Sequence, residues 1–133
     1  MADQDGEVPT GGRILVADDE PHIRRILVTF LEAAGFGVDT VADGAAALER
    51  LRDSEPYDLM VLDILMPEAS GFEVLAEVRS LERAEPLPVL ILTAKGQDAD
   101  REKAFDLGAD AFLTKPFSPK KLLAKINEIL DGR

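Results

Sequence analysis

Acidic, hydroxyl and basic side chains stand directly after short apolar runs at four separate places in the sequence. They are Asp18, Asp19 and Glu20 after residues 14–17, Asp63 after 59–62, Thr93 after 89–92, and Lys115 shortly after 111–113. If these runs are strands of one parallel sheet, their carboxyl ends meet at one edge and the polar side chains converge there.

Carboxylates brought together repel one another, and a hard divalent cation with oxygen ligands is the usual way to offset that repulsion. Magnesium suits one or two carboxylates combined with waters and a phosphate oxygen. Each residue also has a purely structural interpretation. Asp18 or Asp19 would serve as a helix cap, Lys115 as an ion-pair partner, and Thr93 as an ordinary strand-end residue. Their coincidence at four strand ends favours a functional site over four unrelated structural roles.

The apolar runs themselves predict a parallel sheet. Residues 14–17, 59–62 and 89–92 are continuously apolar, which is typical of strands covered on both faces. In residues 38–41, Val38 and Thr40 alternate with Asp39 and Val41, as expected of a strand near a sheet edge. Five strand-helix units in about 120 residues predict an α/β fold, a doubly wound five-stranded parallel sheet with helices on both faces.

Helical patterns separate the strands. Ile23, Ile26, Leu27, Phe30 and Leu31 form one apolar stripe, and residues 122–130 carry another. The pattern over residues 98–107 is the weakest. Pro21 and the pair Ser118-Pro119 are typical of helix starts, and Gly35 and Gly108 of helix ends.

Composition narrows the classes of function. The 133 residues fit one domain, and a net charge of -11 argues against direct binding to nucleic-acid phosphates. No apolar stretch is long enough to span a membrane. The chain has no cysteine, which is compatible with a cytoplasmic location.

Four segments together resemble the receiver domain of bacterial two-component response regulators. They are residues 17–20 (ADDE), 62–67 (LDILMP), 92–94 (LTA) and 114–117 (TKPF). The resemblance covers residues 13–131 and leaves residues 1–12 as a flexible acidic tail. It implies the flavodoxin-like (CheY-like) fold, with strand order 2-1-3-4-5 and five helices. The sequence ends shortly after the last helical pattern, so we expect no output domain within it.

The resemblance implies a role for each site residue. Asp63 is expected to accept a phosphoryl group from a phosphohistidine, which suits a carboxylate because it needs no general base. Asp18, Asp19, Asp63 and the backbone carbonyl of Leu65 are expected to hold Mg²⁺, with Asp18 acting through water. Lys115 is placed to pair with a phosphoryl oxygen. For Glu20, a helix-start role and a supporting role at the site both stay open.

The expected readout uses Thr93 and Phe112. In the family, the threonine hydroxyl bonds the phosphoryl group and an aromatic side chain then moves into the vacated space. Phe112 has no hydroxyl, so its movement would depend on packing alone, and an ordinary core role also stays open. The resemblance further implies a cis peptide bond before Pro116.

The expected partners are a histidine kinase or histidine phosphotransfer protein and an unknown downstream target, with a monomer before phosphorylation. The protein is expected to promote only its own phosphorylation and dephosphorylation and not to be an enzyme. A flavin-binding protein is the first alternative, but it would carry a Gly- or Ser-rich loop where this chain has three acids. An aspartyl phosphatase would have a second aspartate at position 65, and an interaction module would not need the full acid, threonine and lysine set.

Overall fold

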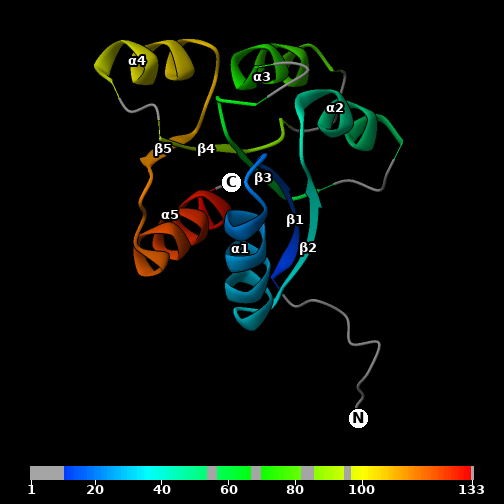
Figure 1. Cartoon of the computed structure of the whole chain (residues 1–133), viewed down its shortest axis with the longest axis vertical. Coiled ribbons are helices and arrows are strands. Elements are labelled where there is room, and N and C mark those ends of the chain that lie inside the picture. Colours follow the sequence, from blue (N-terminus) through cyan, green and yellow to red (C-terminus); the bar gives the residue numbers. More distant parts are fainter. Residues whose placement is uncertain (1–10, 54–56, 67–69, 82–85, 95–96, 133) are drawn as a thin grey trace.

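The computed structural model describes residues 11–53, 57–66, 70–81, 86–94 and 97–132. Five parallel strands form one sheet in the order β2-β1-β3-β4-β5, which confirms the predicted order 2-1-3-4-5 (Figure 1). The strands are β1 (Gly12–Ala17), β2 (Phe36–Val41), β3 (Leu59–Leu62), β4 (Val89–Thr93) and β5 (Ala111–Thr114). The helices are α1 (Pro21–Ala33), α2 (Gly44–Asp53), α3 (Gly71–Ser80), α4 (Asp98–Asp106) and α5 (Pro119–Asp131).

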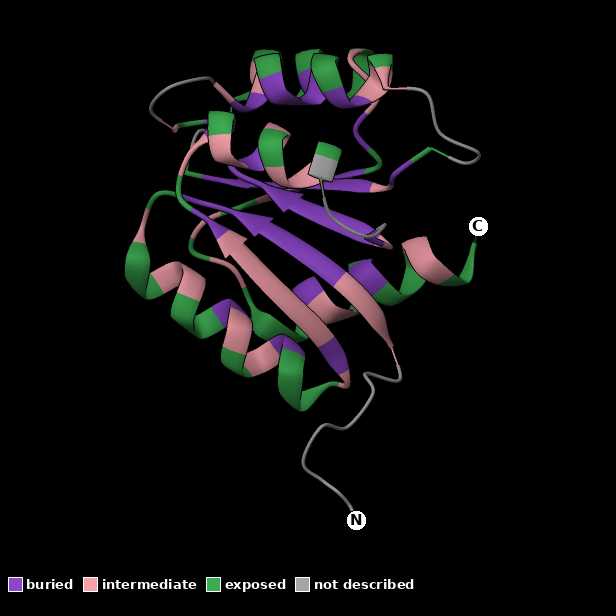
Figure 2. Ribbon diagram, turned by 90° about the vertical axis from the view of Figure 1, so that its right-hand side faces the viewer, coloured by how far each residue is buried: buried purple, intermediate pink, exposed green. Residues whose placement is uncertain are grey.

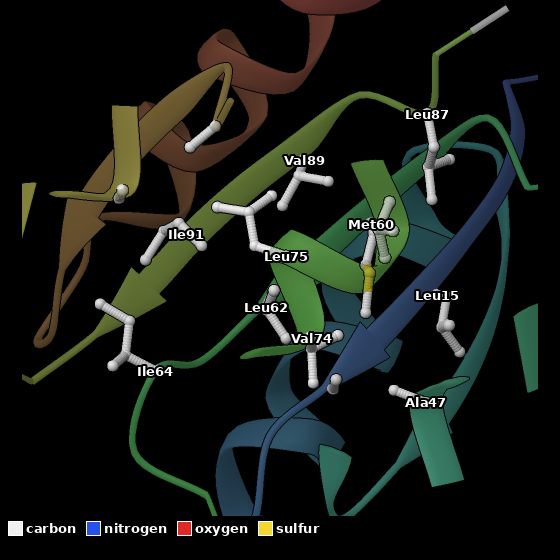
Figure 3. Close-up of a cluster of buried hydrophobic side chains, with 14 of the residues drawn as sticks. Leu15, Ala47, Met60, Leu62, Ile64, Val74, Leu75, Leu87, Val89 and Ile91 are labelled. Carbon is white, nitrogen blue, oxygen red and sulfur yellow. The ribbon is translucent and has the colours of Figure 1, made fainter. Parts of the chain in front are cut away.

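Helices cover both faces of the sheet, so the molecule has two apolar cores. On one face, Leu15, Met60 and Ile91 pack against α2, α3 and α4 (Figure 3). On the other, Ile14 and Val61 pack with residues of α1 and α5. Side chains of a strand alternate between faces, which explains how consecutive residues of β1 enter different cores.

Burial separates the central strands from the edge strand. Every residue of β3 and β4 is buried, whereas β2 is only partly buried between its two ends (Figure 2). This confirms the prediction from the continuous and alternating patterns, because a strand covered on both faces needs apolar residues at every position.

The predicted helix boundaries are also confirmed. α1 begins at Pro21, and the Ser118 hydroxyl accepts a hydrogen bond from the Lys121 backbone N–H at the start of α5. Gly35 and Gly108, which follow α1 and α4, have φ values of 101° and 103°. Such positive φ values favour glycine because it has no Cβ.

Two arginines connect elements at the amino-terminal edge of the sheet. Arg79 of α3 donates hydrogen bonds to the carbonyl oxygens of Gly108 and Leu87. Arg13 of β1 pairs with the Asp39 carboxylate at 2.8 Å, and the Tyr57 hydroxyl donates to the same carboxylate oxygen at 2.6 Å. These contacts fasten the ends of the strands that lie away from the polar residues singled out in the sequence.

The expected flexible tail, residues 1–12, lies mostly outside the described residues, since only Gly11 and Gly12 are described and Gly12 is the first residue of β1. Within the described part of the chain, none of the helices combines the length and apolar character that crossing a membrane requires.

Candidate functional site

Four of the polar residues lie at the carboxyl ends of adjacent strands. Asp18 follows β1, Asp63 follows β3, Thr93 is the last residue of β4, and Lys115 follows β5. Backbone hydrogen bonds fix these positions. The Asp63 N–H donates to the Ala17 carbonyl at 3.0 Å, and the Lys115 N–H donates to the Thr93 carbonyl at 2.9 Å. The sheet therefore sets the spacing of the site, while the loops supply its side chains.

The Lys115 side chain reaches from the edge strand across β4 to β1 and β3. Its ammonium nitrogen lies 2.8 Å from Asp18 Oδ2, 2.6 Å from Glu20 Oε1 and 3.0 Å from Asp63 Oδ2. Neighbouring strands lie about 4.8 Å apart, so β5 is about 10 Å from β3. Only a long side chain from β5 spans that gap, and lysine delivers a point charge at its end.

Both oxygens of the Asp63 carboxylate have donors. Oδ1 accepts the Leu65 backbone N–H at 3.1 Å, and Oδ2 accepts the Lys115 ammonium. The Asp63 residue is only 3% exposed. These contacts hold the plane of the carboxylate in one orientation at the edge of the sheet.

Gly71, the first residue of α3, packs directly against the backbone at Asp63. A Cβ at this position would overlap the Asp63 carbonyl oxygen and approach the Ile64 Cα to 2.6 Å. The Gly71 N–H donates to the Ile64 carbonyl at 2.9 Å. The absence of a side chain at Gly71 lets α3 start close beneath the loop that carries Asp63.

Charge and burial act in opposite directions within the site. Burial raises the pKa of Asp18, because it outweighs the hydrogen bond from Lys115 that lowers it. The hydrogen bond from Lys115 lowers the pKa of the half-exposed Glu20. Burial alone would lower the pKa of Lys115, but its hydrogen bonds to Asp18, Glu20 and Asp63 outweigh burial and raise it. Lys115 is therefore a permanent cation held by an excess of carboxylates.

The acidic group is suited to a divalent cation. One oxygen from each of Asp18, Glu20 and Asp63 lies within 4.8 Å of the others. Three carboxylates facing one ammonium leave surplus negative charge, and hard oxygen donors are what Mg²⁺ prefers. The residues therefore fit the ion that the sequence predicted.

The structure separates Asp19 from Glu20. Asp19 is exposed and is not among the described residues that form the acidic group, whereas the Glu20 carboxylate contacts Lys115. Glu20 occupies the N-cap position of α1, but its side chain makes no capping hydrogen bond. Of the two roles left open for Glu20, its side chain takes the one at the site. The role of Asp19 as a magnesium ligand stays a prediction.

The two residues expected to respond to phosphorylation, Thr93 and Phe112, belong to the strands next to the site. Thr93 is fully buried, and Phe112 is 5% exposed and belongs to the core beneath α2, α3 and α4. The Lys115–Pro116 peptide bond is cis. The Leu65 side chain is 50% exposed, so it lies open to solvent two residues beyond Asp63.

The sequence alone did not predict the close contact of Gly71 with the backbone at Asp63, nor the hydrogen bond that the Arg24 side chain donates to the Asp18 backbone carbonyl at 2.6 Å. The signal for Gly71 was a glycine at the start of an apolar helical pattern, directly after Ser70, whose side chain forms a capping box with Glu73. Nothing in the local sequence distinguishes Arg24 from the other basic residues of α1.

Comparison with known proteins gives the class. The model of the response regulator receiver domain family matches residues 14–127. The chain belongs to this family, and it is therefore a signalling domain of the kind found in two-component response regulators.

Individual relatives agree with this assignment. The chain is 42% identical over 118 residues to the transcriptional regulatory protein CpxR homolog of Haemophilus influenzae, covering 89% of this chain and 50% of the relative. It is 42% identical over 120 residues to the transcriptional regulatory protein GltR of Pseudomonas aeruginosa, covering 90% of this chain and 49% of the relative. The chain thus spans about half the length of these curated relatives.

Solved structures show the same fold. A CheY-like response regulator receiver domain protein from Methanospirillum hungatei superposes with a TM-score of 0.84 at 30% identity, covering 90% of this chain and 94% of that one. The chemotaxis response regulator CheY4 of Vibrio cholerae gives a TM-score of 0.82 at 32% identity, covering 89% and 98%.

Proposed function

We propose that this chain accepts a phosphoryl group on Asp63 from a phosphohistidine of a sensor kinase or phosphotransfer protein and then changes its partner-binding surface. One observation carries the proposal. In a chain of the receiver family, the Lys115 ammonium lies within 3.0 Å of carboxylates from the ends of β1 and β3, including that of Asp63.

The reaction needs a nucleophile that is held in place and a site that tolerates added negative charge. An Asp63 oxygen attacks the phosphorus, the bond from phosphorus to the histidine nitrogen breaks, and the imidazole leaves with the electron pair. The product is an aspartyl phosphate. Phosphoryl transfer depends mainly on positioning and on charge stabilisation. The Leu65 N–H and the Lys115 ammonium supply the positioning, since each bonds one oxygen of Asp63.

Asp18 and Asp63, with Asp19 or Glu20, would hold Mg²⁺ at this site. When bound, the ion would supply positive charge against the phosphoryl oxygens. Lys115 would then exchange a carboxylate contact for a contact with a phosphoryl oxygen. Because Lys115 is anchored on β5, this exchange would connect the chemistry at β3 with the far edge of the sheet.

Thr93 and Phe112 lie on β4 and β5, between β3 and the far edge of the sheet, where a movement of Lys115 would alter their surroundings. Thr93 ends β4 between Asp63 and Lys115, and Phe112 lies on the neighbouring strand, paired in register with Ile91. We propose that the Thr93 hydroxyl bonds the phosphoryl group and that Phe112 moves as a result. The phosphoryl group would then shift an equilibrium between two arrangements of the surface formed by α4 and β5.

The surface of α1, the helix that begins directly after Glu20, supports a protein as the phosphodonor. Ile26 of α1 is 45% exposed, and Leu65 beside Asp63 is 50% exposed. A surface cavity of about 410 Å³ is lined by Ile26, Phe30, His22, Arg25 and Thr29. Exposed apolar side chains that gather on one face are typical of a docking surface. We therefore expect Ile26→Ser to slow transfer from a phosphohistidine protein more than transfer from acetyl phosphate.

Mass spectrometry of the intact protein tests the central step. Acetyl phosphate with Mg²⁺ should add about 80 Da, the mass of one phosphoryl group. Asp63→Asn should abolish the adduct, while Asp106→Asn, a matched change at an exposed aspartate of α4, should leave it intact. A folded wild-type protein that gains no mass would favour an interaction module that is not phosphorylated.

A further inference from the structure

Helix α4 is attached to the rest of the molecule with very little apolar surface. Six of its nine residues are charged, and Ala104 is its only buried residue. Phe105, its one large apolar side chain, is 41% exposed. An ordinary surface helix is held by a stripe of apolar residues at every turn. Other contacts must therefore contribute to seating α4 on the sheet.

Two cations of α4 lie over aromatic rings of neighbouring elements. The Lys103 ammonium is 4.4 Å from the centre of the Phe72 ring on α3. The Arg101 guanidinium carbon is 5.8 Å from the centre of the Phe112 ring on β5, and 5.6 Å from that of Phe105 on its own helix. All three distances lie within the range of about 6 Å in which a cation attracts an aromatic face.

The ring beneath Arg101 is the one that the proposed function assigns to the switch. Phe112 is buried in the core that α4 covers, and Arg101 closes over that ring from the solvent side, because its own side chain is exposed. A movement of Phe112 or of α4 changes the distance between the guanidinium and the ring. The two movements would therefore be coupled through this contact.

We propose that Arg101 is a positioning residue that keeps α4 seated on Phe112 in the unphosphorylated protein and so sets the equilibrium that phosphorylation shifts. This inference rests on the proposed function for its second half, because the shift requires phosphorylation of Asp63. Loss of the contact raises the energy of the unphosphorylated arrangement alone, so the other arrangement gains population.

Amide hydrogen exchange over α4 measures the seating directly. A cation–aromatic contact at an exposed site is worth about two- to five-fold in an equilibrium constant. We expect Arg101→Gln to speed exchange in residues 98–106 by about that factor in the unphosphorylated protein. Arg101→Lys keeps a cation over the ring and should retain at least half of the protection. Lys125→Gln removes the same charge from an exposed position on α5 and should leave exchange in α4 unchanged.

A second measurement separates coupling to Phe112 from a general loosening of the helix. In a Phe112→Leu background the ring is gone, so Arg101→Gln should add little further exchange. With the ring present, Arg101→Gln should also raise the rate of labelling by acetyl phosphate by about two- to five-fold. A merely structural role for Arg101 would leave that rate unchanged or lower it.

The outcomes divide cleanly. Faster exchange in Arg101→Gln, retained protection in Arg101→Lys, and loss of the effect without the Phe112 ring support the proposal. Unchanged exchange in Arg101→Gln, equal loosening in Arg101→Lys, or an undiminished effect in the Phe112→Leu background overturns it. If acetyl phosphate labels no variant, including the wild type, the proposed function fails. The exchange data on the unphosphorylated protein would still decide whether Arg101 seats α4.

Discussion

Replacing Asp18 with asparagine should stabilise the metal-free protein, although Asp18 pairs with Lys115 at 2.8 Å. At an effective dielectric constant of about 20, that attraction is about 6 kcal/mol. One carboxylate oxygen of Glu20 and one of Asp63 each lie within 4.8 Å of an Asp18 oxygen. At the same dielectric constant, the repulsion between Asp18 and each of these two carboxylates costs about 3.5 kcal/mol. The two repulsions together slightly exceed the attraction, and burial of the charge adds to the cost. We expect Asp18→Asn to raise the free energy of unfolding by about 1–2 kcal/mol at pH 7.

Urea unfolding in EDTA provides the assay. The amide oxygen of asparagine still offers an acceptor for the Glu20 N–H, which now donates to Asp18 at 2.9 Å. The amide NH₂ then faces the Lys115 ammonium, which keeps Glu20 and Asp63 as its acceptors. In Mg²⁺ the difference in unfolding free energy between Asp18→Asn and the wild type should become smaller or change sign, because only the wild type keeps all the carboxylates that would bind the ion. A ligand at ten times its Kd stabilises by about 1.4 kcal/mol.

The pH dependence of unfolding is an independent test of whether the ionised Asp18 destabilises the folded protein. The pKa of Asp18 is raised in the folded protein, so its contribution to stability is fully present below the unfolded pKa and is lost as pH rises through the folded pKa. The advantage of Asp18→Asn should therefore shrink as the pH falls from 7 toward the ordinary aspartate range.

Glu20→Gln is the matched control with the opposite sign. The pKa of Glu20 is lowered, so its ionised form favours folding, and this contribution is lost as pH falls through the folded pKa. Because Glu20 is half exposed, the loss on substitution should stay below about 1 kcal/mol. A less stable Asp18→Asn protein in EDTA at pH 7, or a gap between it and the wild type that widens in acid, would refute the electrostatic reasoning.

Three further changes test features that support the site and the fold. Gly71→Ala should cost about 1–3 kcal/mol in urea unfolding and slow acetyl phosphate labelling of Asp63, because the new Cβ meets backbone atoms; unchanged stability would contradict the close packing. Tyr57→Phe removes a hydrogen bond to the Asp39 carboxylate and should cost about 1 kcal/mol at pH 7. The pKa of Asp39 is lowered, chiefly by that bond, so the loss should diminish as pH falls through its folded pKa, and a pH-independent loss would argue against the assignment. Ser70→Ala removes the N-cap of α3 and should cost about 1 kcal/mol in the same assay, whereas a neutral result would mean that the capping box contributes nothing.

Much of the fold could be predicted because burial on two faces imposes a simple pattern. Runs such as residues 59–62 and 89–92 are apolar at every position, and the structure buries every one of those residues. The convergence of Asp18, Asp63 and Lys115 could also be predicted from the sequence, because the carboxyl ends of parallel strands lie at one edge of the sheet.

The orientation of side chains within one loop could not be predicted in the same way. Asp19 and Glu20 are neighbours of the same charge, and spacing alone places both at the site. The structure exposes Asp19 and brings the longer Glu20 side chain to Lys115 where the chain enters α1. The tight approach of Gly71 to the backbone at Asp63 could not be predicted either, because it depends on how close the tertiary fold brings these two segments.

The two ends of the sheet differ in what a damaging mutation would do. The carboxyl ends carry Asp63 and Lys115, whereas the amino-terminal ends carry the Arg79 contacts to Gly108 and Leu87 and the Arg13 pair with Asp39. A substitution at the amino-terminal end would leave each surviving folded molecule chemically competent and reduce the number of such molecules in the cell. Signal strength would then fall through protein abundance, and raised expression would restore it. If Asp63 is the phosphoacceptor, as proposed, no increase in expression would restore a chain that lacks its carboxylate.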